Sequence, residues 1–439
     1  MAVSTLSALS TSLKQVYDDS IFEVMYNTNV PFFNLLKQVK SVRPEGAGLY
    51  FPFYLRSPQN IGTPAEAGNL PVVNTRTEVQ GYVQPGQMIG TFEMSFIFEA
   101  VGTQRGSFNK DEVKRHSLEC ISDLTKHVNR LYAGTHGTGR LGQVNATTSS
   151  LATFVGKLPL GTLLMRPNMM IDVYSADTSG SVRTGANAVK ITDIAPTTRT
   201  VTFDDGSGGA GSASLTADDH VYIDASYGNA TVPNGIAGLI DDGTLLTTVH
   251  NQSRSTYTEL KSVATAAASG SNLANLTEDM LVRMALDIRQ RSGSIIDCLL
   301  MNTGQIEKYL AFVRPDRRYP QSGAGVPKYD TGYQEEPLTF VYGGKRCPMY
   351  VSEDIHPRRI YFVNKSKLRL GTLKKMSWYD HGGGNIFAQG VNSTGYKTTQ
   401  QATLVHIENL VNLQPNAHGV LTALSDPQLC GSSVGGTDT

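Results

Sequence analysis

The peptide GSSVG, residues 431–435, has the G-x-S-x-G spacing of a serine nucleophile. In enzymes that use this motif, the serine lies on a tight turn between a strand and a helix, which exposes its hydroxyl oxygen. No helical pattern follows Ser433 in this chain. The sequence therefore predicts no catalytic serine, and no constellation of acid, base and nucleophile supports a hydrolase.

Two other groupings could bind a metal ion. His116 and Cys120 are four residues apart in a helical pattern, which would place them on one helix face. The segment TADDHVYID, residues 216–224, combines three aspartates with a histidine. A buried thiol beside a half-exposed imidazole explains the first grouping, and turn aspartates explain the second. The four cysteines form no CxxC pair, so we predict no metal site, no cofactor and no enzymatic activity.

The densest basic cluster is RPDRRYP, residues 314–320, in which Arg314, Arg317 and Arg318 surround Asp316. A solvated loop is one interpretation. Arginine also suits bidentate ion pairs between subunits, and it can neutralise nucleic-acid phosphates. The sequence leaves these three interpretations open, and the four residues remain candidate contacts.

Composition favours a subunit of a larger assembly. The 439 residues include 38 basic and 38 acidic side chains, a balance that argues against a dedicated nucleic-acid-binding protein. Only 17% of the residues are charged, against about 25% in typical soluble domains. Interface cores are depleted in charge, which could account for the shortfall. We expect no signal peptide, no membrane span, and free thiols in a reducing cytoplasm.

The first elements expected along the chain are an arm and a ribbon. Residues 5–40 read as an amphipathic arm that is interrupted at Pro31. Residues 46–98 predict a long two-stranded ribbon, whose β-rich flanks near 48–56 and 77–98 enclose a tip rich in Gly, Pro and Asn. A lone ribbon is marginal in water. We therefore expect its aromatic side chains to require a surface on another subunit.

The rest of the chain predicts one long helix, an insertion and a mixed body. Residues 107–135 carry a continuous apolar stripe at helical spacing. Short strands over 158–226 suggest a small barrel or sandwich. An α/β body over 229–385 contains a helix that should begin after Thr277 and end at Gly293. A late return strand follows this body.

This order of elements resembles the major capsid proteins of tailed bacteriophages, which have the Hong Kong 97-like fold. GTPAEAGNLP is similar to the tip of that family's extended loop, and SFNKDEVKRHSLECISDLTKHVNRL is similar to its spine helix. IIDCLLMNTGQIEKYL and YGGKRCPMYVSEDIHPRRIYFVNKSKL resemble axial-domain segments, and TQQATLVHIENLVNLQPNAHGVLTAL resembles the closing peripheral strand. The resemblance implies an α+β fold with an N-terminal arm, an extended β loop, a long spine helix, peripheral and axial domains, and an inserted small β module.

The resemblance also implies a division of the chain. The expected parts are an N-terminal arm (1–45), the extended loop (46–98), a peripheral domain with the spine helix (99–157), the inserted β module (158–228), the axial domain (229–385), peripheral return strands (386–425) and a C-terminal tail (426–439).

The implied function is that of a shell subunit. Hexamers and pentamers of the chain would form an icosahedral head around double-stranded DNA, which would touch the inner face without sequence preference. A separate scaffolding protein, a portal and a decoration or cement protein are the expected partners. The protein would then be found in the virion, and in the host cytoplasm during assembly. An encapsulin-like compartment protein is the alternative within the same fold, and another virion protein or a surface adhesin is a more distant one.

The candidate inter-subunit contacts are the four residues of the basic cluster and five residues of the loop: Tyr50, Phe51, Phe53, Arg56 and Glu66. Some members of the family weld their shells by joining a loop lysine to a neighbour's asparagine. This chain has no lysine between Lys40 and Lys110. We therefore expect its shell to be held without covalent links from the loop.

Overall fold

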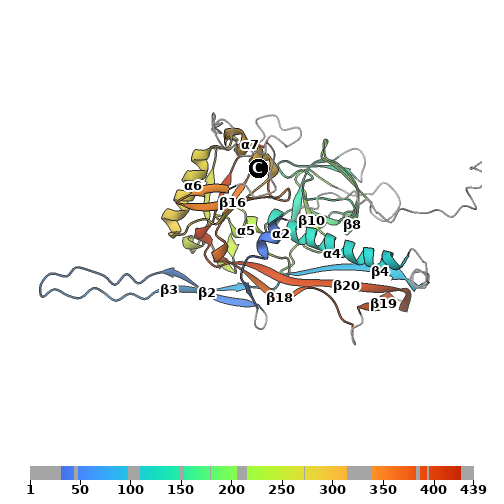
Figure 1. The fold of residues 1–439 in the computed structure, drawn as a ribbon, viewed down its shortest axis with the longest axis horizontal. Coiled ribbons are helices and arrows are strands. Elements are labelled where there is room, and N and C mark those ends of the chain that lie inside the picture. The colour runs from blue at the N-terminus through green and yellow to red at the C-terminus, as the bar shows by residue number, and fades with distance from the viewer. Residues whose placement is uncertain are drawn as a thin grey trace, which may run out of the picture.

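A computed structural model describes residues 31–43, 48–96, 109–147, 153–177, 179–204, 215–270, 272–313, 339–381, 386–392 and 395–426. Figure 1 shows an elongated molecule in which a thin ribbon extends from one end of a mixed helical and β body, and a barrel (β8 and β10 are labelled) stands beside α4 in the half away from the ribbon. Residues 1–30 of the predicted arm (1–45) and the basic cluster at 314–320 lie outside the described residues.

A long sheet runs the length of the body. It contains β1 (Ser41–Val42), β18 (Leu368–Trp378), β20 (Gly395–Asn412), β19 (Phe387–Asn392) and β4 (Gln87–Ser95). β20 is the common partner, because it pairs antiparallel with β18, β19 and β4. The long helix α4 (Asn109–Gly134) lies along this sheet and places Leu124, Val128 and Leu131 in the core. The sequence predictions of one long helix and one long late strand are therefore confirmed.

A second sheet has six strands in the order β13 (Val263–Ala266), β21 (Gly419–Thr422), β17 (Ile360–Val363), β14 (Cys298–Met301), β16 (Lys345–Val351) and β15 (Thr339–Tyr342). The helices α6 (Glu278–Ser292) and α7 (Thr303–Val313) belong to the same body. The Thr277 hydroxyl accepts from the Met280 amide at 3.4 Å, and Gly293 ends α6 with φ 68°. Both predicted cap positions are confirmed.

The inserted module is a closed barrel with its own apolar core. Its strands are β5 (Arg140–Thr147), β6 (Thr153–Gly156), β7 (Met170–Tyr174), β8 (Val189–Ala195), β9 (Thr200–Asp204) and β10 (His220–Ile223). The barrel thus begins at Arg140, well before the predicted start at residue 158. The first two strands were assigned to the preceding domain because only their pairing with β9 and β10 reveals where they belong.

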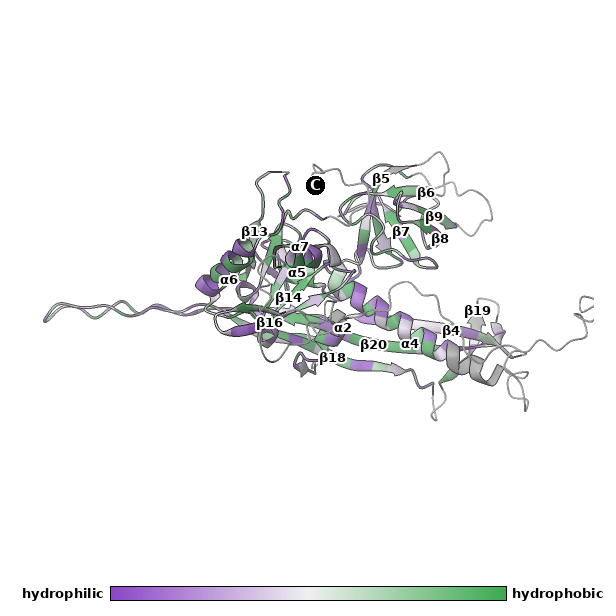
Figure 2. Cartoon of the chain, turned by 45° about the horizontal axis from the view of Figure 1, so that its top comes forward, coloured by the Kyte–Doolittle hydropathy of each residue, from purple (hydrophilic) through white to green (hydrophobic). Residues whose placement is uncertain are grey.

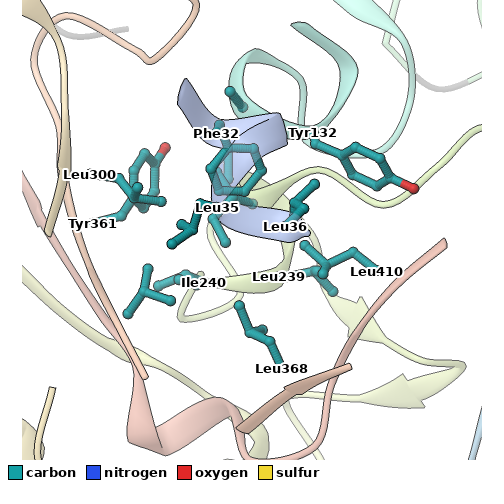
Figure 3. Packing of buried hydrophobic residues seen from close by; sticks show 14 of the residues in the cluster. Phe32, Leu35, Leu36, Tyr132, Leu239, Ile240, Leu300, Tyr361, Leu368 and Leu410 are labelled. Carbon is teal, nitrogen blue, oxygen red and sulfur yellow. The ribbon is translucent and has the colours of Figure 1, made fainter. Parts of the chain in front are cut away.

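The main core is built around a short helix near the arm. Pro31 begins α2 (Pro31–Leu36), which places Phe32, Leu35 and Leu36 against residues of both sheets, as Figure 3 shows. Five small elements complete this region: α5 (Ile236–Leu239), β11 (Thr248–Val249), β12 (Gln252–Ser253), and the 3-10 turns Thr258–Leu260 and Pro415–Ala417. A third 3-10 turn, Lys365–Lys367, precedes β18.

Two predicted domain boundaries differ from the observed sheets. The expected axial segment 229–385 includes β18, which instead pairs with β1 and β20 in the long sheet. The expected peripheral segment 386–425 includes β21, which instead pairs with β13 and β17 in the six-stranded sheet. The last strands of the chain therefore alternate between the two sheets. Local sequence patterns do not show which sheet each of these strands joins.

Candidate assembly surfaces

The ribbon consists of β2 (Leu49–Arg56) and β3 (Thr77–Val83), paired antiparallel. The predicted flank 77–98 is divided, because β4 leaves the ribbon and joins β20. Side chains alternate along β2, as the two-residue period of a strand requires. Phe51 and Phe53 point to one face, while Tyr50 and Tyr54 remain 53% and 67% exposed on the other.

The first of these faces packs on the chain's own body. Phe53 is only 4% exposed, and the rings of Phe51 and Phe53 lie 5.4 and 6.2 Å from the imidazole of His250. Gly81 opposes Phe51, and a Cβ there would lie 2.8 Å from both phenylalanine rings. The prediction that these two aromatic side chains lack a surface on their own subunit is therefore wrong.

His250 is held as a neutral acceptor beneath the ribbon. Its Nε2 accepts a hydrogen bond from the Asn412 amide at 3.0 Å. Burial, with a smaller contribution from Arg254, lowers the pKa of His250 to about 3. The guanidinium of Arg254 is fully buried and donates to the carbonyl oxygens of Leu246 and Gly238, both at 2.8 Å. The root of the ribbon, around Phe51 and Phe53, is thus fixed to the body by apolar packing on the His250 ring, whose Nε2 is hydrogen-bonded and whose Nδ1 has no partner among the described residues.

Arg56 also has a partner within the chain. Its Nε donates to Oε1 of Glu259 at 2.6 Å, and this hydrogen bond holds the pKa of Glu259 below its usual range. The Arg56 side chain is 60% exposed, so the pair contributes little to stability in water. The part of the ribbon that packs on the body ends at Arg56.

The tip, residues 57–76, extends beyond the body (Figure 1). The Gly68 amide donates to the Ala65 carbonyl at 2.8 Å, and Ala67 adopts φ 60°, which forms a turn with Glu66 at its apex. Asn60 bridges the two legs, since its Oδ1 accepts from the Asn74 amide at 2.7 Å. Large apolar side chains on the tip are 80–93% exposed: Ile61, Leu70, Val72 and Val73.

The exposed apolar patch therefore lies on the tip, whereas the sequence predicted it on the aromatic residues of the preceding strand. These four aliphatic residues were missed because they are scattered in a Gly, Pro and Asn-rich run without strand periodicity. Of the predicted contacts, Tyr50 and Glu66 are exposed, while Phe51, Phe53 and Arg56 are engaged within the chain. Arg314, Asp316, Arg317 and Arg318 lie outside the described residues.

An open groove of about 1010 Å³ lies between α4, β4 and the barrel. Figure 2 shows the barrel standing over α4, with β4 alongside that helix. Its lining includes residues 166–170 next to and at the start of β7, and α4 residues between His116 and Leu131, among them the partly buried Cys120. Its lining is mixed: apolar members include Ile89, Leu124, Met169, Met170, Ile223 and Val232, and acidic members are Glu119, Asp123 and Asp224.

Arg130 of α4 lines this groove, and its side chain is nearly buried, with only 7% of the residue exposed. Its Nε has no hydrogen-bond acceptor among the described residues. Burial lowers the pKa of Arg130 to about 10, although the charge of Asp354 opposes this shift. Asp354 is shared, because it also lies 3.7 Å from Arg166 and accepts from Asn129 at 2.5 Å. A nearly buried guanidinium with an unused donor is costly unless another group supplies an acceptor.

The residues considered for metal binding have other partners. His116 Nδ1 lies 3.2 Å from Glu119, Asp218 pairs with Lys157 at 2.7 Å, and Arg183 binds Asp219. Within the described ranges, no group of three or more His, Cys, Asp or Glu side chains could hold a metal ion. Ser433 lies outside those ranges. None of the helices in the described part of the chain is both long and apolar enough to cross a bilayer.

Comparison with solved structures gives matches over nearly the whole chain. A chain from the capsid of cyanophage A-1(L) aligns with a TM-score of 0.56 and 11% identity, covering 96% of this chain and 99% of that one. A capsid chain of a native GTA particle aligns with a TM-score of 0.48 and 11% identity, covering 97% and 100%. A chain of Gordonia phage Cozz aligns with a TM-score of 0.46 and 11% identity, covering 96% of each.

No protein-family model and no curated protein matches this sequence. At 11% identity, the cyanophage match shows a shared fold. This fold is mixed helix and strand, and it is found in a phage capsid.

Proposed function

We propose that this chain is the major capsid protein of a tailed double-stranded DNA bacteriophage, and that it acts as a structural subunit and not as an enzyme. The single observation that carries this proposal is the ribbon tip. It presents four aliphatic side chains at 80–93% exposure on a finger that its own body does not cover. An exposed apolar patch of this kind promotes aggregation of a monomer. In a closed shell every copy has a neighbour that can cover the patch.

The shared fold supports the same conclusion, because the cyanophage capsid chain aligns over 96% of this chain. In the proposed assembly, hexamers and pentamers close into an icosahedral head. The contacts are non-covalent, since residues 41–109 contain no lysine. A separate scaffolding protein, a portal and a cement protein are the proposed partners, and packaged DNA touches the inner face without sequence preference.

Negative-stain electron microscopy of the expressed full chain tests the proposal. We expect closed, uniform shells when a candidate scaffolding protein is co-expressed, and irregular or few shells without it. The matched control carries Ser in place of Ile61, Leu70, Val72 and Val73, which removes the apolar patch without touching the packed root. We expect this control to remain a folded subunit that does not assemble. A wild-type chain that stays monomeric under all these conditions would contradict the proposal.

A further inference from the structure

Basic side chains gather around β1 and β18, although the chain as a whole is balanced in charge. The described residues 31–43 contain Lys37, Lys40 and Arg43 and no acidic residue. Residues 360–378, from the start of β17 to the end of β18, also contain no acidic residue, and their five basic residues are Lys365, Lys367, Arg369, Lys374 and Lys375. Two such segments side by side create a local excess of positive charge.

Strand pairing brings the two segments together. β1 pairs parallel with the start of β18, and the Leu370 amide donates to the Lys40 carbonyl at 3.1 Å. Lys40 and Arg369 are therefore neighbours across the two strands. Lys365 lies close by, because its Nζ donates to Oε1 of Gln38 at 3.1 Å. Like charges at neighbouring positions repel each other, so an anion bound across them would stabilise the arrangement.

The carboxylates around this region leave these cations uncompensated. Asp297 binds Lys345, and Glu408 is only 8% exposed and lies 2.8 Å from His406. Asp380 lies beyond the end of β18. Within the described part of the chain, no ion pair to a carboxylate is formed by six cations, which we call the basic stripe: Lys40, Lys365, Lys367, Arg369, Lys374 and Lys375.

The stripe is long and lies on one side of the molecule. A strand advances about 3.3 Å per residue, so Arg369 and Lys375 are separated by about 20 Å along β18. Figure 2 shows the barrel and β18 on opposite sides of α4. None of the six cations lines the groove beside α4 or the smaller pocket beneath β3.

The dimensions favour duplex DNA over an acidic peptide as the partner. Duplex DNA carries one phosphate charge per about 1.7 Å of its axis, whereas an extended peptide carries at most one charge per about 3.3 Å. Peptides are also usually held by pockets for their side chains, and the stripe lines neither of the two cavities. Lysine and arginine contacts to phosphate carry no sequence information.

We propose that the basic stripe binds the phosphate backbone of duplex DNA without reading its sequence. This inference rests on the proposed function, which supplies packaged DNA as the polyanion, and it identifies the surface that meets the DNA. It also orients the subunit, because β18 then faces the interior of the shell and the barrel, on the other side of α4, faces outward (Figure 2).

Salt-dependent DNA binding tests the stripe. Full-length subunits, kept below the concentration at which they assemble, are titrated into a labelled duplex of mixed sequence, and anisotropy gives the binding constant at several salt concentrations. The test variant combines Lys40→Gln, Lys367→Gln and Lys374→Gln. Arg369 stays in place, because it also donates to the carbonyl oxygens of Ser366 and Leu368.

Loss of three phosphate contacts should make the slope of log K against log salt shallower by about 2.7, and should weaken binding at least tenfold at about 100 mM salt. The matched control removes three exposed charges from α6 through Arg283→Gln, Arg289→Gln and Arg291→Gln, and should change binding less than twofold. A thermal melt of each variant verifies its fold. The wild-type slope is a test that needs no variant, and a slope near zero would overturn the inference.

Competition separates the two kinds of polyanion. Poly-glutamate at the same total charge should displace the labelled duplex at least tenfold less well than unlabelled duplex does. Equal displacement would overturn the assignment to DNA and indicate an acidic protein as the partner. If the wild-type chain forms no shells, the proposed function fails. If shells form and the lysine variant binds DNA with the wild-type affinity and salt slope, only the role of the stripe fails.

Discussion

Phe53 and Ile61 show how two apolar residues of one ribbon serve different purposes. Phe53 is buried against His250 and closes the core beneath the ribbon root. Ile61 is eight residues further along the chain and is 93% exposed. Burial of an apolar side chain contributes about 1.5–3 kcal/mol. The root therefore stabilises the subunit, whereas the tip can contribute only after another molecule covers it.

The first prediction compares these two residues. Phe53→Ala should lower the free energy of unfolding by about 3–5 kcal/mol, because it leaves a cavity between the ribbon and His250. Ile61→Ala should change that free energy by less than about 0.5 kcal/mol and should reduce assembly. Denaturation of the subunit, followed by the fluorescence of its single tryptophan, measures the first quantity, and light scattering measures the second. Equal effects of both variants on unfolding would contradict the division of the ribbon.

The second prediction concerns pH. Burial lowers the pKa of both His250 and His418 to about 3, while the unfolded chain protonates its histidines near pH 6.5. Below pH 6.5 these two histidines bind protons in the unfolded chain, whereas in the folded subunit they stay neutral until the pH approaches 3. Subunit stability should therefore be full above pH 6.5 and fall as the pH drops toward 3, by at most about 1.4 kcal/mol per pH unit for each histidine.

Denaturation curves of the subunit at pH 7.5, 6.5 and 5.5 measure this slope. His250→Gln keeps an acceptor for the Asn412 amide and removes one titrating group, so it should make the slope shallower. His381→Gln, at an exposed position, is the matched control. A stability that does not change between pH 7.5 and 5.5 would contradict the assignment of neutral buried imidazoles.

At the scale of elements, the barrel is a separable unit. Its strands close on themselves, and its apolar core is distinct from that of the body. Its two ends also meet, since Tyr222 pairs with Arg140 and the Ile223 amide donates to the Gly139 carbonyl at 3.0 Å. An insertion with adjacent ends can be removed without stretching the remaining chain.

The third prediction follows from this arrangement. Replacing residues 140–223 with a short Gly-Ser linker should leave a folded subunit, which circular dichroism and a cooperative melt would show. We expect shell formation to be impaired nevertheless, because the barrel is then missing from the surface that each copy presents to its neighbours. A linker of doubled length is the control for strain at the junction. Normal, stable shells from the shortened chain would remove any structural role for the barrel.

Local signals in the sequence predicted the elements, and distant pairings decided the domains. Thr277 and Gly293 delimit α6 through contacts within a few residues, so their pattern is complete in the sequence. β18 and β21 were placed in the wrong bodies because each is defined by partners elsewhere in the chain. The burial of Phe53 could not be predicted for the same reason, since His250 lies almost two hundred residues away. The sequence does not distinguish Arg130 from the other polar residues of the predicted helix, because the groove that it lines forms only when the barrel packs beside α4.

At the scale of the whole molecule, the chain combines a stable body with an extended finger that only an assembly can use. The cores of the two sheets and of the barrel are internal to the subunit. The contacts proposed between subunits are made by the exposed aliphatic side chains of the ribbon tip. Such contacts are individually weak, and a closed shell gains strength by repeating them in every copy.

The fourth prediction concerns the covalent state of that shell. Because residues 41–109 contain no lysine, the ribbon cannot form an isopeptide bond through a lysine of its own. Native shells that are boiled in denaturant with reductant should therefore migrate as free monomer on a gel. Native shells that are treated with a chemical cross-linker before boiling provide a positive control for a ladder. A ladder from native shells under reducing conditions would show a cross-link from another source.

The pairing of early strands with late ones has a consequence for synthesis. β4 cannot pair until β20 has been synthesised, and β13 cannot pair until β21 has been synthesised. Neither sheet is complete before then. Translation at about 5–20 residues per second needs about 15–60 s to cover the roughly three hundred residues between β4 and β20. A nascent chain or a truncated product therefore carries unpaired strand edges and an unfinished groove. Only a chain that has been translated through β21 can complete both sheets, so the order of strands would keep truncated products out of a shell.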